Sequence, residues 1–181
     1  MDMLEIGNGG MSTIEYQTHF TIWAILKSNL ILGNDVSSMS KEDLAIVSNK
    51  EVIAINQDVL GVSASLVHRQ NRRFNLIADV DIWAGPLSND RFVVMLFNRN
   101  SAEKRDIVLD IGKHLKKDNS TEFKGRFRNV WEAKDLSFHS EFVAKDVLPH
   151  QSILLVVSDI AKLSESEQKK VDKSDSEHVE L

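Results

Sequence analysis

Short apolar segments and helical periodicity alternate along the first fifty residues. Segments 3–6 and 30–32 are mainly apolar, and Gly33 ends the second of them. Short apolar runs bounded in this way are typical of strands that are covered on both faces of a sheet. The segments that follow each of them carry apolar residues three and four positions apart, which predicts helices. The order strand, helix, strand, helix is typical of parallel βα units.

Capping signals predict where the two helices begin. Ser12 followed by Glu15 forms a capping box, in which the Ser12 side chain bonds the third helical N–H while Glu15 reaches back. The helix that follows presents its aromatic residues, among them Phe20 and Trp23, on one face. Ser40 caps the second helix, which is expected to end near position 49.

Beyond Gly61 the pattern changes to a period of two. Polar and apolar residues alternate over 79–83, and 91–97 is a strongly apolar run after a turn rich in Gly, Pro, Ser and Asn. Further segments of β type lie at 106–111, 126–131, 138–143 and 153–157. Strands of this length, separated by turn signals, predict an antiparallel β-sandwich.

The two patterns predict a multidomain α+β chain. Residues 1–60 are expected to form the parallel part and residues 61–160 the antiparallel sandwich, with the boundary near 59–65. Ser, Glu, Lys and Asp dominate the end of the chain, so residues 161–181 are predicted to be a disordered charged tail. This tail ends in His-Val-Glu-Leu, which differs by one residue from the His-Asp-Glu-Leu retrieval signal of the endoplasmic reticulum. A bare solvated tail is the alternative explanation.

Composition and charge exclude several classes of protein. The 181 residues are 42% hydrophobic and 27% charged, as is ordinary for globular proteins. The net charge of -5 argues against a nucleic-acid partner, which requires a basic face. No apolar run approaches the ~18 residues of a membrane helix, so a membrane partner is not expected. Because the chain has no cysteines, it has no disulfides and no thiolate metal site.

The histidines do not indicate a metal site. They are His19, His68, His114, His139, His150 and His178. None of them pairs with another two to four positions away, which is the usual spacing of metal ligands on one element. No phosphate-binding glycine loop is present either, and no cofactor is expected. The triplet 119–121 is a glycosylation sequon, which matters only if the chain enters the secretory pathway.

Four blocks of the sequence, in order, resemble the α-galactosidases of glycoside hydrolase family 27. Residues 2–8 are similar to the family's Asp-Met-Leu-x-x-Gly-Asn run. Residues 23–35 are similar to its Trp-Ala-x-x-Lys-x-Pro-Leu-x-x-x-Asn-Asp run, with Asn29 in place of Pro. Residues 48–61 match its Asn-Gln-Asp block and residues 82–99 its C-terminal domain. The chain is therefore identified as similar to the C-terminal portion of these enzymes.

The resemblance, which covers residues 2–158, implies both fold and chemistry. It implies the last two βα units of a (β/α)₈ TIM barrel, followed by an antiparallel β-sandwich. Enzymes of the family retain the configuration of the sugar and use two carboxylates, a nucleophile and an acid/base. In the family these come from a Lys-x-Asp and an Arg-x-x-x-Asp segment. Both are expected to lie before Met1, so no catalytic residue is assigned in this chain.

The resemblance implies that Asp2 and Met3 bind substrate. The matching residues of the family line the galactose pocket, and barrel enzymes collect such residues at the C-terminal ends of their strands. Asp2 would accept a hydrogen bond from a sugar hydroxyl, and Met3 would pack on the apolar face of the ring. In this chain taken alone, a frayed terminus is the alternative for Asp2. An α-galactoside is the partner expected for the full-length enzyme, and homo-oligomer formation stays open. By resemblance the location is the secretory pathway or outside the cell, with the endoplasmic reticulum, vacuole and lysosome as candidates.

Other polar residues have a structural interpretation. Asn34 and Asp35 follow the second strand and are interpreted as caps of a turn rather than substrate contacts. Residues 56–58, an Asn-Gln-Asp run, precede the boundary between the two regions. Their side chains suit the task of tying backbone groups of the two regions together.

Aromatic residues are interpreted as core. Trp83, Phe97 and Trp131 could form a sugar-stacking platform, but on alternating strands such residues more often pack inside. Because two strands are a small part of an eight-stranded barrel, the helix faces of Phe20 and Trp23 are expected to be uncovered.

Two hypotheses about function follow. The first is an enzyme part, the C-terminal fragment of a retaining α-galactosidase that is inactive without its two carboxylates. The second is a non-catalytic β-sandwich module that serves structure or carbohydrate contact. Sequence that precedes Met1 in the gene and carries both carboxylate segments would distinguish them.

Overall fold

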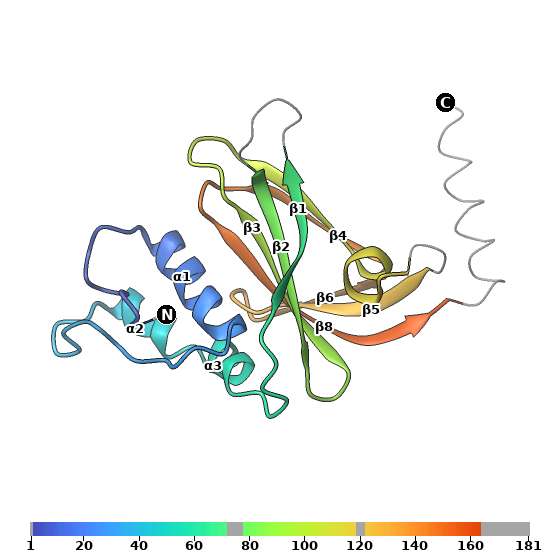
Figure 1. The fold of residues 1–181 in the computed structure, drawn as a ribbon. Helices are drawn as coiled ribbons and strands as arrows, with labels where there is room; N and C mark the ends of the chain where they lie inside the picture. Colours follow the sequence, from blue (N-terminus) through green and yellow to red (C-terminus); the bar gives the residue numbers. More distant parts are fainter. Residues whose placement is uncertain (1, 72–77, 119–121, 164–181) are drawn as a thin grey trace.

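A computed structural model describes residues 2–71, 78–118 and 122–163 (Figure 1). Within these residues the elements are α1 (Thr13–Ile25), α2 (Lys41–Val47), α3 (Lys50–Asn56), β1 (Ser65–Asn71), β2 (Ala78–Leu87), β3 (Arg91–Asn98), β4 (Arg105–Asp110), β5 (Phe123–Asn129), β6 (Lys134–His139), β7 (Glu141–Val147) and β8 (Ser152–Lys162). A π-helical turn, η1 (Gly112–Lys116), lies between β4 and β5. The sequon and the end of the tail, from residue 164 onward, lie outside the described residues.

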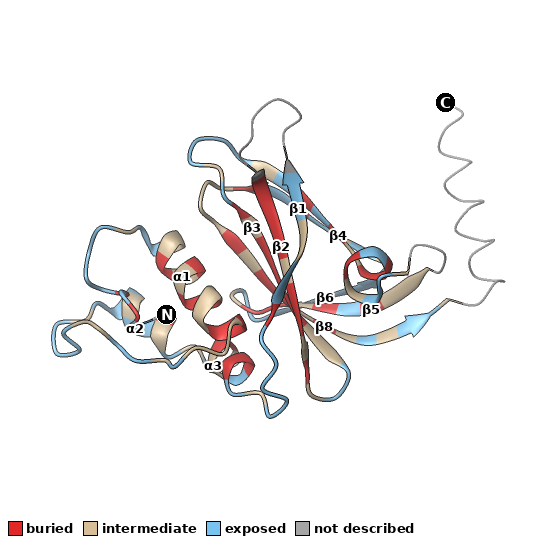
Figure 2. Ribbon diagram, viewed as in Figure 1, coloured by how far each residue is buried: buried red, intermediate tan, exposed pale blue. Residues whose placement is uncertain are grey.

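The strands form a sandwich of two antiparallel sheets. The larger sheet has the order β1-β2-β3-β8-β5-β6, and the smaller consists of β4 and β7. Along β3 the buried residues alternate between two cores: Val93 and Met95 pack towards the helices, and Val94 and Leu96 pack towards the smaller sheet. The molecule therefore has three layers, with helices on one face of the larger sheet and the smaller sheet on the other (Figures 1 and 2).

The helices begin where the capping signals predicted. Ser12 and Glu15 form the complete capping box of α1, and Ser40 accepts a hydrogen bond from the third residue of α2. α3 was not predicted from the sequence. It starts three residues after α2 ends, because the Asn49 side chain accepts two backbone N–H groups and starts a new helix.

The two strands expected over 3–6 and 30–32 are not formed as strands. Leu4 and Leu32 make a single parallel bridge, in which the Leu4 N–H donates to the carbonyl of Ile31 at 2.7 Å. Leu4 is fully buried, but Ile31 is 52% exposed and Leu32 36% exposed. The expectation that both faces of the second segment are covered is therefore wrong. The parallel bridge with α1 between its two segments is nevertheless the arrangement of a barrel βα unit.

Two further sequence predictions are corrected within the sandwich. The single strand expected over 138–143 is broken at Ser140, which separates β6 from β7. Trp131 lies in the turn after β5 rather than on a strand. No described helix combines the length and the apolar character that a membrane span requires.

Candidate functional site

Asp2 and Met3 lie at the start of the barrel-like segment, just before the bridge residue Leu4. Both are exposed. A Cβ at Gly33 would lie 3.1 Å from the Met3 Cβ and from the Leu4 carbonyl oxygen, so the absence of a side chain there lets the two segments approach. The structure thus places Met3 beside Gly33, with the Asp2 carboxylate open to solvent.

The two polar residues after the second segment have different surroundings. The Asp35 carboxylate accepts hydrogen bonds from the backbone N–H of Ser37 at 2.9 Å and from its hydroxyl at 2.6 Å. These bonds lower the pKa of Asp35 and confirm its interpretation as a turn cap. The Asn34 side-chain oxygen is buried and has no hydrogen-bond partner among the described residues.

The Asn-Gln-Asp run ties the two regions together through Asp58. Its carboxylate accepts hydrogen bonds from the Ser88 N–H at 2.9 Å, from the Ser88 hydroxyl at 2.7 Å and from Arg91 at 3.3 Å. Burial alone would raise the pKa of Asp58, but the hydrogen bonds from Ser88 and from the Leu60 N–H, together with the charge of Lys27, outweigh it and the pKa is lowered. Asn56 acts within the helical region, where its amide donates to the Ser28 carbonyl at 2.8 Å. The structural interpretation of this run is confirmed.

The aromatic residues lie at the junction between the helices and the larger sheet. The Trp131 indole N–H donates to the Thr21 hydroxyl at 3.0 Å, and its ring centroid lies 6.5 Å from that of Phe20. Phe20 is 1% exposed, so the expectation that its face is uncovered is wrong. Trp83, Phe97 and Trp131 are partly buried and pack against the core that the helices share with the sheet. The interpretation of the three as core residues is confirmed, although Trp131 reaches it from a turn.

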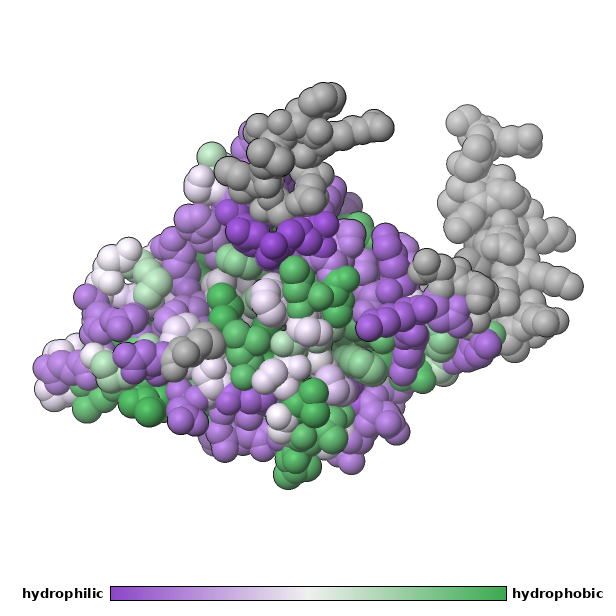
Figure 3. All heavy atoms as spheres, in the orientation of Figure 1, coloured by the Kyte–Doolittle hydropathy of each residue, from purple (hydrophilic) through white to green (hydrophobic). Residues whose placement is uncertain are grey.

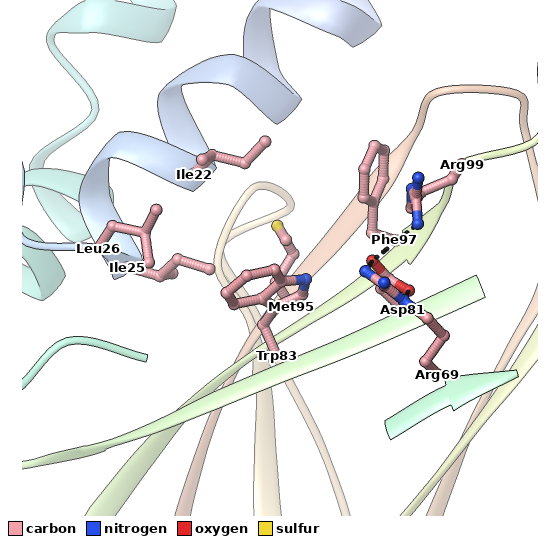
Figure 4. Close-up of a pocket in the computed structure, with 9 residues that line it drawn as sticks. All are labelled: Ile22, Ile25, Leu26, Arg69, Asp81, Trp83, Met95, Phe97 and Arg99. Atoms are coloured by element: carbon pink, nitrogen blue, oxygen red, sulfur yellow. Dashed lines mark hydrogen bonds and ion pairs between the residues drawn. The ribbon is translucent and has the colours of Figure 1, made fainter. Parts of the chain in front are cut away.

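A cavity of about 220 Å³ separates the end of α1 from β2 and β3 (Figure 4). One end of it is ionic. The Asp81 side chain is 3% exposed, and its carboxylate accepts two hydrogen bonds of 2.8 Å from Arg69. Arg99 approaches the same carboxylate at 3.5 Å. The hydrogen bonds to Asp81 raise the pKa of Arg69, which stays charged. Sequence reasoning missed this cluster, because it depends on the register of three strands.

Two histidines far apart in the sequence approach each other on the other side of the sandwich. The ring centroids of His68 and His114 are 5.2 Å apart, and burial lowers the pKa of both. The His114 Nδ1 accepts a hydrogen bond from the Asp110 N–H, so its proton in the neutral form is on Nε2. A protonated Nε2 cannot bind a metal ion. Among the described residues there is no group of three or more metal-ligating side chains.

The structure combines a barrel-like βα unit with an antiparallel β-sandwich, and the buried carboxylate of Asp58 ties the two together. Comparison with known proteins identifies the family. Residues 1–58 match the family model of alpha galactosidase A, and residues 78–157 match that of the alpha galactosidase C-terminal beta sandwich domain. The chain belongs to the α-galactosidase family and corresponds to the C-terminal part of its members.

Individual relatives agree with this assignment. Alpha-galactosidase 2 of Arabidopsis thaliana is 40% identical over 151 residues, which are 82% of this chain and 35% of that protein. An α-galactosidase of Schizosaccharomyces pombe is 48% identical over 136 residues, which are 75% of this chain and 29% of that protein. The crystal structure of α-galactosidase I from Mortierella vinacea superposes with a TM-score of 0.79 at 35% identity, over 90% of this chain and 40% of that one. The chain thus spans about a third of these curated relatives.

Proposed function

We propose that this chain is the C-terminal part of a retaining α-galactosidase that removes terminal α-linked galactose from oligosaccharides or glycoconjugates. The observation that carries the proposal is the match to both family models in the family's own order. Asp2 and Met3 contribute one wall of the sugar site. The nucleophile and the acid/base aspartate come from barrel sequence of the kind that the relatives carry ahead of the matched segment.

The chemistry of Asp2 and Met3 supports their role. An exposed carboxylate accepts hydrogen bonds from sugar hydroxyls, and such bonds orient the ring between two catalytic carboxylates that lie about 5 Å apart in retaining enzymes. The flexible thioether of Met3 packs on the apolar face of a pyranose. Gly33 leaves room for this side chain beside the second barrel segment. A compartment of the secretory pathway, or the outside of the cell, is the location that we propose with this function.

A chimera tests the proposal. The part of the Mortierella vinacea enzyme that precedes the matched segment is joined ahead of Asp2, and hydrolysis of an aryl α-galactoside is measured. We expect activity from the chimera and none from the 181 residues alone. Asp2→Asn should lower kcat/KM by about a hundredfold, because a misplaced substrate loses its alignment with the catalytic groups.

Asp90→Asn, in an exposed turn of the sandwich, is the matched control and should leave kcat/KM unchanged. Hydrolysis by the 181 residues alone, or a folded chimera in which Asp2→Asn has no effect, would contradict the proposal. A folded but inactive chimera would favour the non-catalytic module.

A further inference from the structure

Four exposed residues, 7–10, lie between the Asp2–Met3 segment and α1, and we call them the glycine loop. Gly7, Gly9 and Gly10 have φ angles of +89°, +83° and +83°. A Cβ at Gly9 or Gly10 would meet nothing within 4 Å, so both face open space. Figure 3 shows pale, nearly neutral surface where this segment lies beside α1 in Figure 1. The loop follows the first bridged segment at its carboxyl end, where barrel enzymes collect their substrate contacts.

The first turn of α1 holds the glycine loop at two points. Glycine loses more conformational freedom on folding than any other residue, so a loop rich in it depends on contacts from outside. The Tyr16 hydroxyl accepts the Gly9 N–H at 2.7 Å, and Tyr16 is only 6% exposed. The Glu15 Oε2 accepts the Ser12 N–H at 2.8 Å and the Ser12 hydroxyl at 2.9 Å. Tyr16 thus holds the middle of the loop, and Glu15 holds the point where the loop joins the helix.

His150, in the turn between β7 and β8, reaches the same turn of α1 from the sandwich. Its Nδ1 lies 2.8 Å from the Glu15 Oε1, and its carbonyl accepts the Thr18 hydroxyl at 2.9 Å. The Ser12 N–H and then His150 lower the pKa of Glu15 to about 2. Because an ionised carboxylate only accepts hydrogen bonds, the His150 Nδ1 carries a proton and donates it. One carboxylate therefore joins the sandwich, through Oε1, to the end of the glycine loop, through Oε2.

We propose that His150 is a positioning residue for the substrate site. By holding Glu15, it fixes the first turn of α1 and, with it, the glycine loop that follows Asp2 and Met3. A role limited to fastening the two regions would leave the loop unaffected, because the junction has a separate tie through Asp58. The inference rests on the proposed function, since it takes Asp2 and Met3 as sugar contacts.

Hydrogen exchange of the Gly9 and Ser12 amides, followed by NMR in the 181-residue chain, tests the link from His150 to the loop. His150→Ala should speed the exchange of both amides at least fivefold. His150→Asn should restore the wild-type rates, because its amide N–H can donate to Glu15 and asparagine tolerates the φ of +59° at this position. Asp58→Ala loosens the junction elsewhere and should leave both rates unchanged. Unchanged rates in His150→Ala, or equal acceleration by Asp58→Ala, overturn the proposal.

Kinetics of the chimera test the consequence for the substrate. His150→Ala should lower kcat/KM by about tenfold, mainly through a higher KM, because a displaced loop aligns the substrate less well. His150→Asn should be close to wild type, and Asp58→Ala should lower the melting temperature without changing KM. An active chimera in which His150→Ala leaves KM unchanged overturns this inference and leaves the proposed function standing. An inactive chimera contradicts the proposed function, and the exchange rates in the chain alone then decide whether His150 holds the loop.

Discussion

The sandwich and the barrel-like region bury their strands to different degrees. In the sandwich, the central strands β3 and β8 have fully buried residues along their length, such as Val93, Val94, Leu154 and Leu155. In the region 2–58, the bridge residue Leu4 is buried, but its partner Leu32 and the neighbouring Ile31 are exposed. β3 pairs with β2 and β8, and β8 pairs with β3 and β5, so both have two neighbours within the described chain, whereas the two bridged segments pair only with each other among the described residues. An apolar segment of this chain therefore forms a strand where neighbouring strands are available to pair with it, and the apolar pattern alone is not sufficient.

The two regions are nevertheless fastened to each other. One core includes Phe20 and Val52 from the helices together with Met95 and Leu154 from the larger sheet. Polar contacts surround it: the Thr18 hydroxyl accepts the Ser152 N–H at 2.9 Å, and Arg128 holds both carboxylate oxygens of Glu51 at 2.6 and 2.7 Å. The sandwich also has a second core to which the helices do not contribute. The helical region therefore depends on the sandwich more than the sandwich depends on the helices.

Removing one large side chain from each core should give the largest effect. Phe127→Ala and Phe20→Ala should each lower the free energy of unfolding by about 3–5 kcal/mol, measured by urea titration. Phe127→Ala should unfold the sandwich. Phe20→Ala should release the helices, so that limited proteolysis trims the chain to about residues 63–158, the sandwich with its own core. A protease-resistant product that retains Trp23 but loses Trp83 would contradict the dependence of the helical region on the sandwich.

Loss of the Asp58 carboxylate should have a smaller effect. Asp58→Ala leaves the Ser88 N–H and hydroxyl without their acceptor, at a cost of about 1–3 kcal/mol in urea unfolding. Asp90→Ala, which is exposed, is the control. A cost equal to that of the control would mean that the junction does not depend on this contact.

The clamp between α3 and β5 should contribute less again. Glu51→Gln weakens the pair with Arg128, whose side chains are 37% and 32% exposed. Because solvent screens such a pair, we expect a loss of about 0.5–1 kcal/mol in thermal unfolding. Asp135→Asn removes a more exposed partner of Arg128 and should cost less. If Asp135→Asn costs more than Glu51→Gln, the main partner of Arg128 is Asp135, which lies within the sandwich.

Acid should produce the smallest effect on the contact between the regions. Hydrogen bonds from the Ser12 backbone and from His150 lower the pKa of Glu15 to about 2. A carboxyl with a lowered pKa stabilises the fold above its ordinary value of 4.5, and this stabilisation is lost as the pH falls towards 2. Urea midpoints of the wild type should therefore approach those of Glu15→Gln as the pH falls through this window. A constant difference between pH 6 and pH 3 would contradict the assignment.

Local signals in the sequence predicted part of the fold. The Ser12 capping box located α1, alternation located β2, and a continuous apolar run located β3. β1 was missed because it is an edge strand whose Leu66 is exposed and whose polar residues hide the alternation. α3 was missed because Asn49 lies so soon after the end of α2.

The candidate sites depended on information of other kinds. Asp2 and Met3 were indicated only by the family resemblance, and their role stays a prediction. The ionic end of the cavity beside α1 could not be predicted, because Arg69 meets Asp81 only through the register of β1 on β2, and Arg99 arrives from the end of β3. Register is set by the packing of whole faces, which a single sequence does not show.

The position of β8 has a consequence for synthesis of the protein. β8 comes last in the described chain, yet it lies between β3 and β5 in the larger sheet (Figure 1). Until it leaves the ribosome, the sheet can exist only as two separate pieces, β1-β2-β3 and β5-β6, each with an unpaired edge, and the edge strand β3 is strongly apolar. Such edges promote association with other chains. A nascent chain interrupted before Ser152 should therefore need chaperone protection.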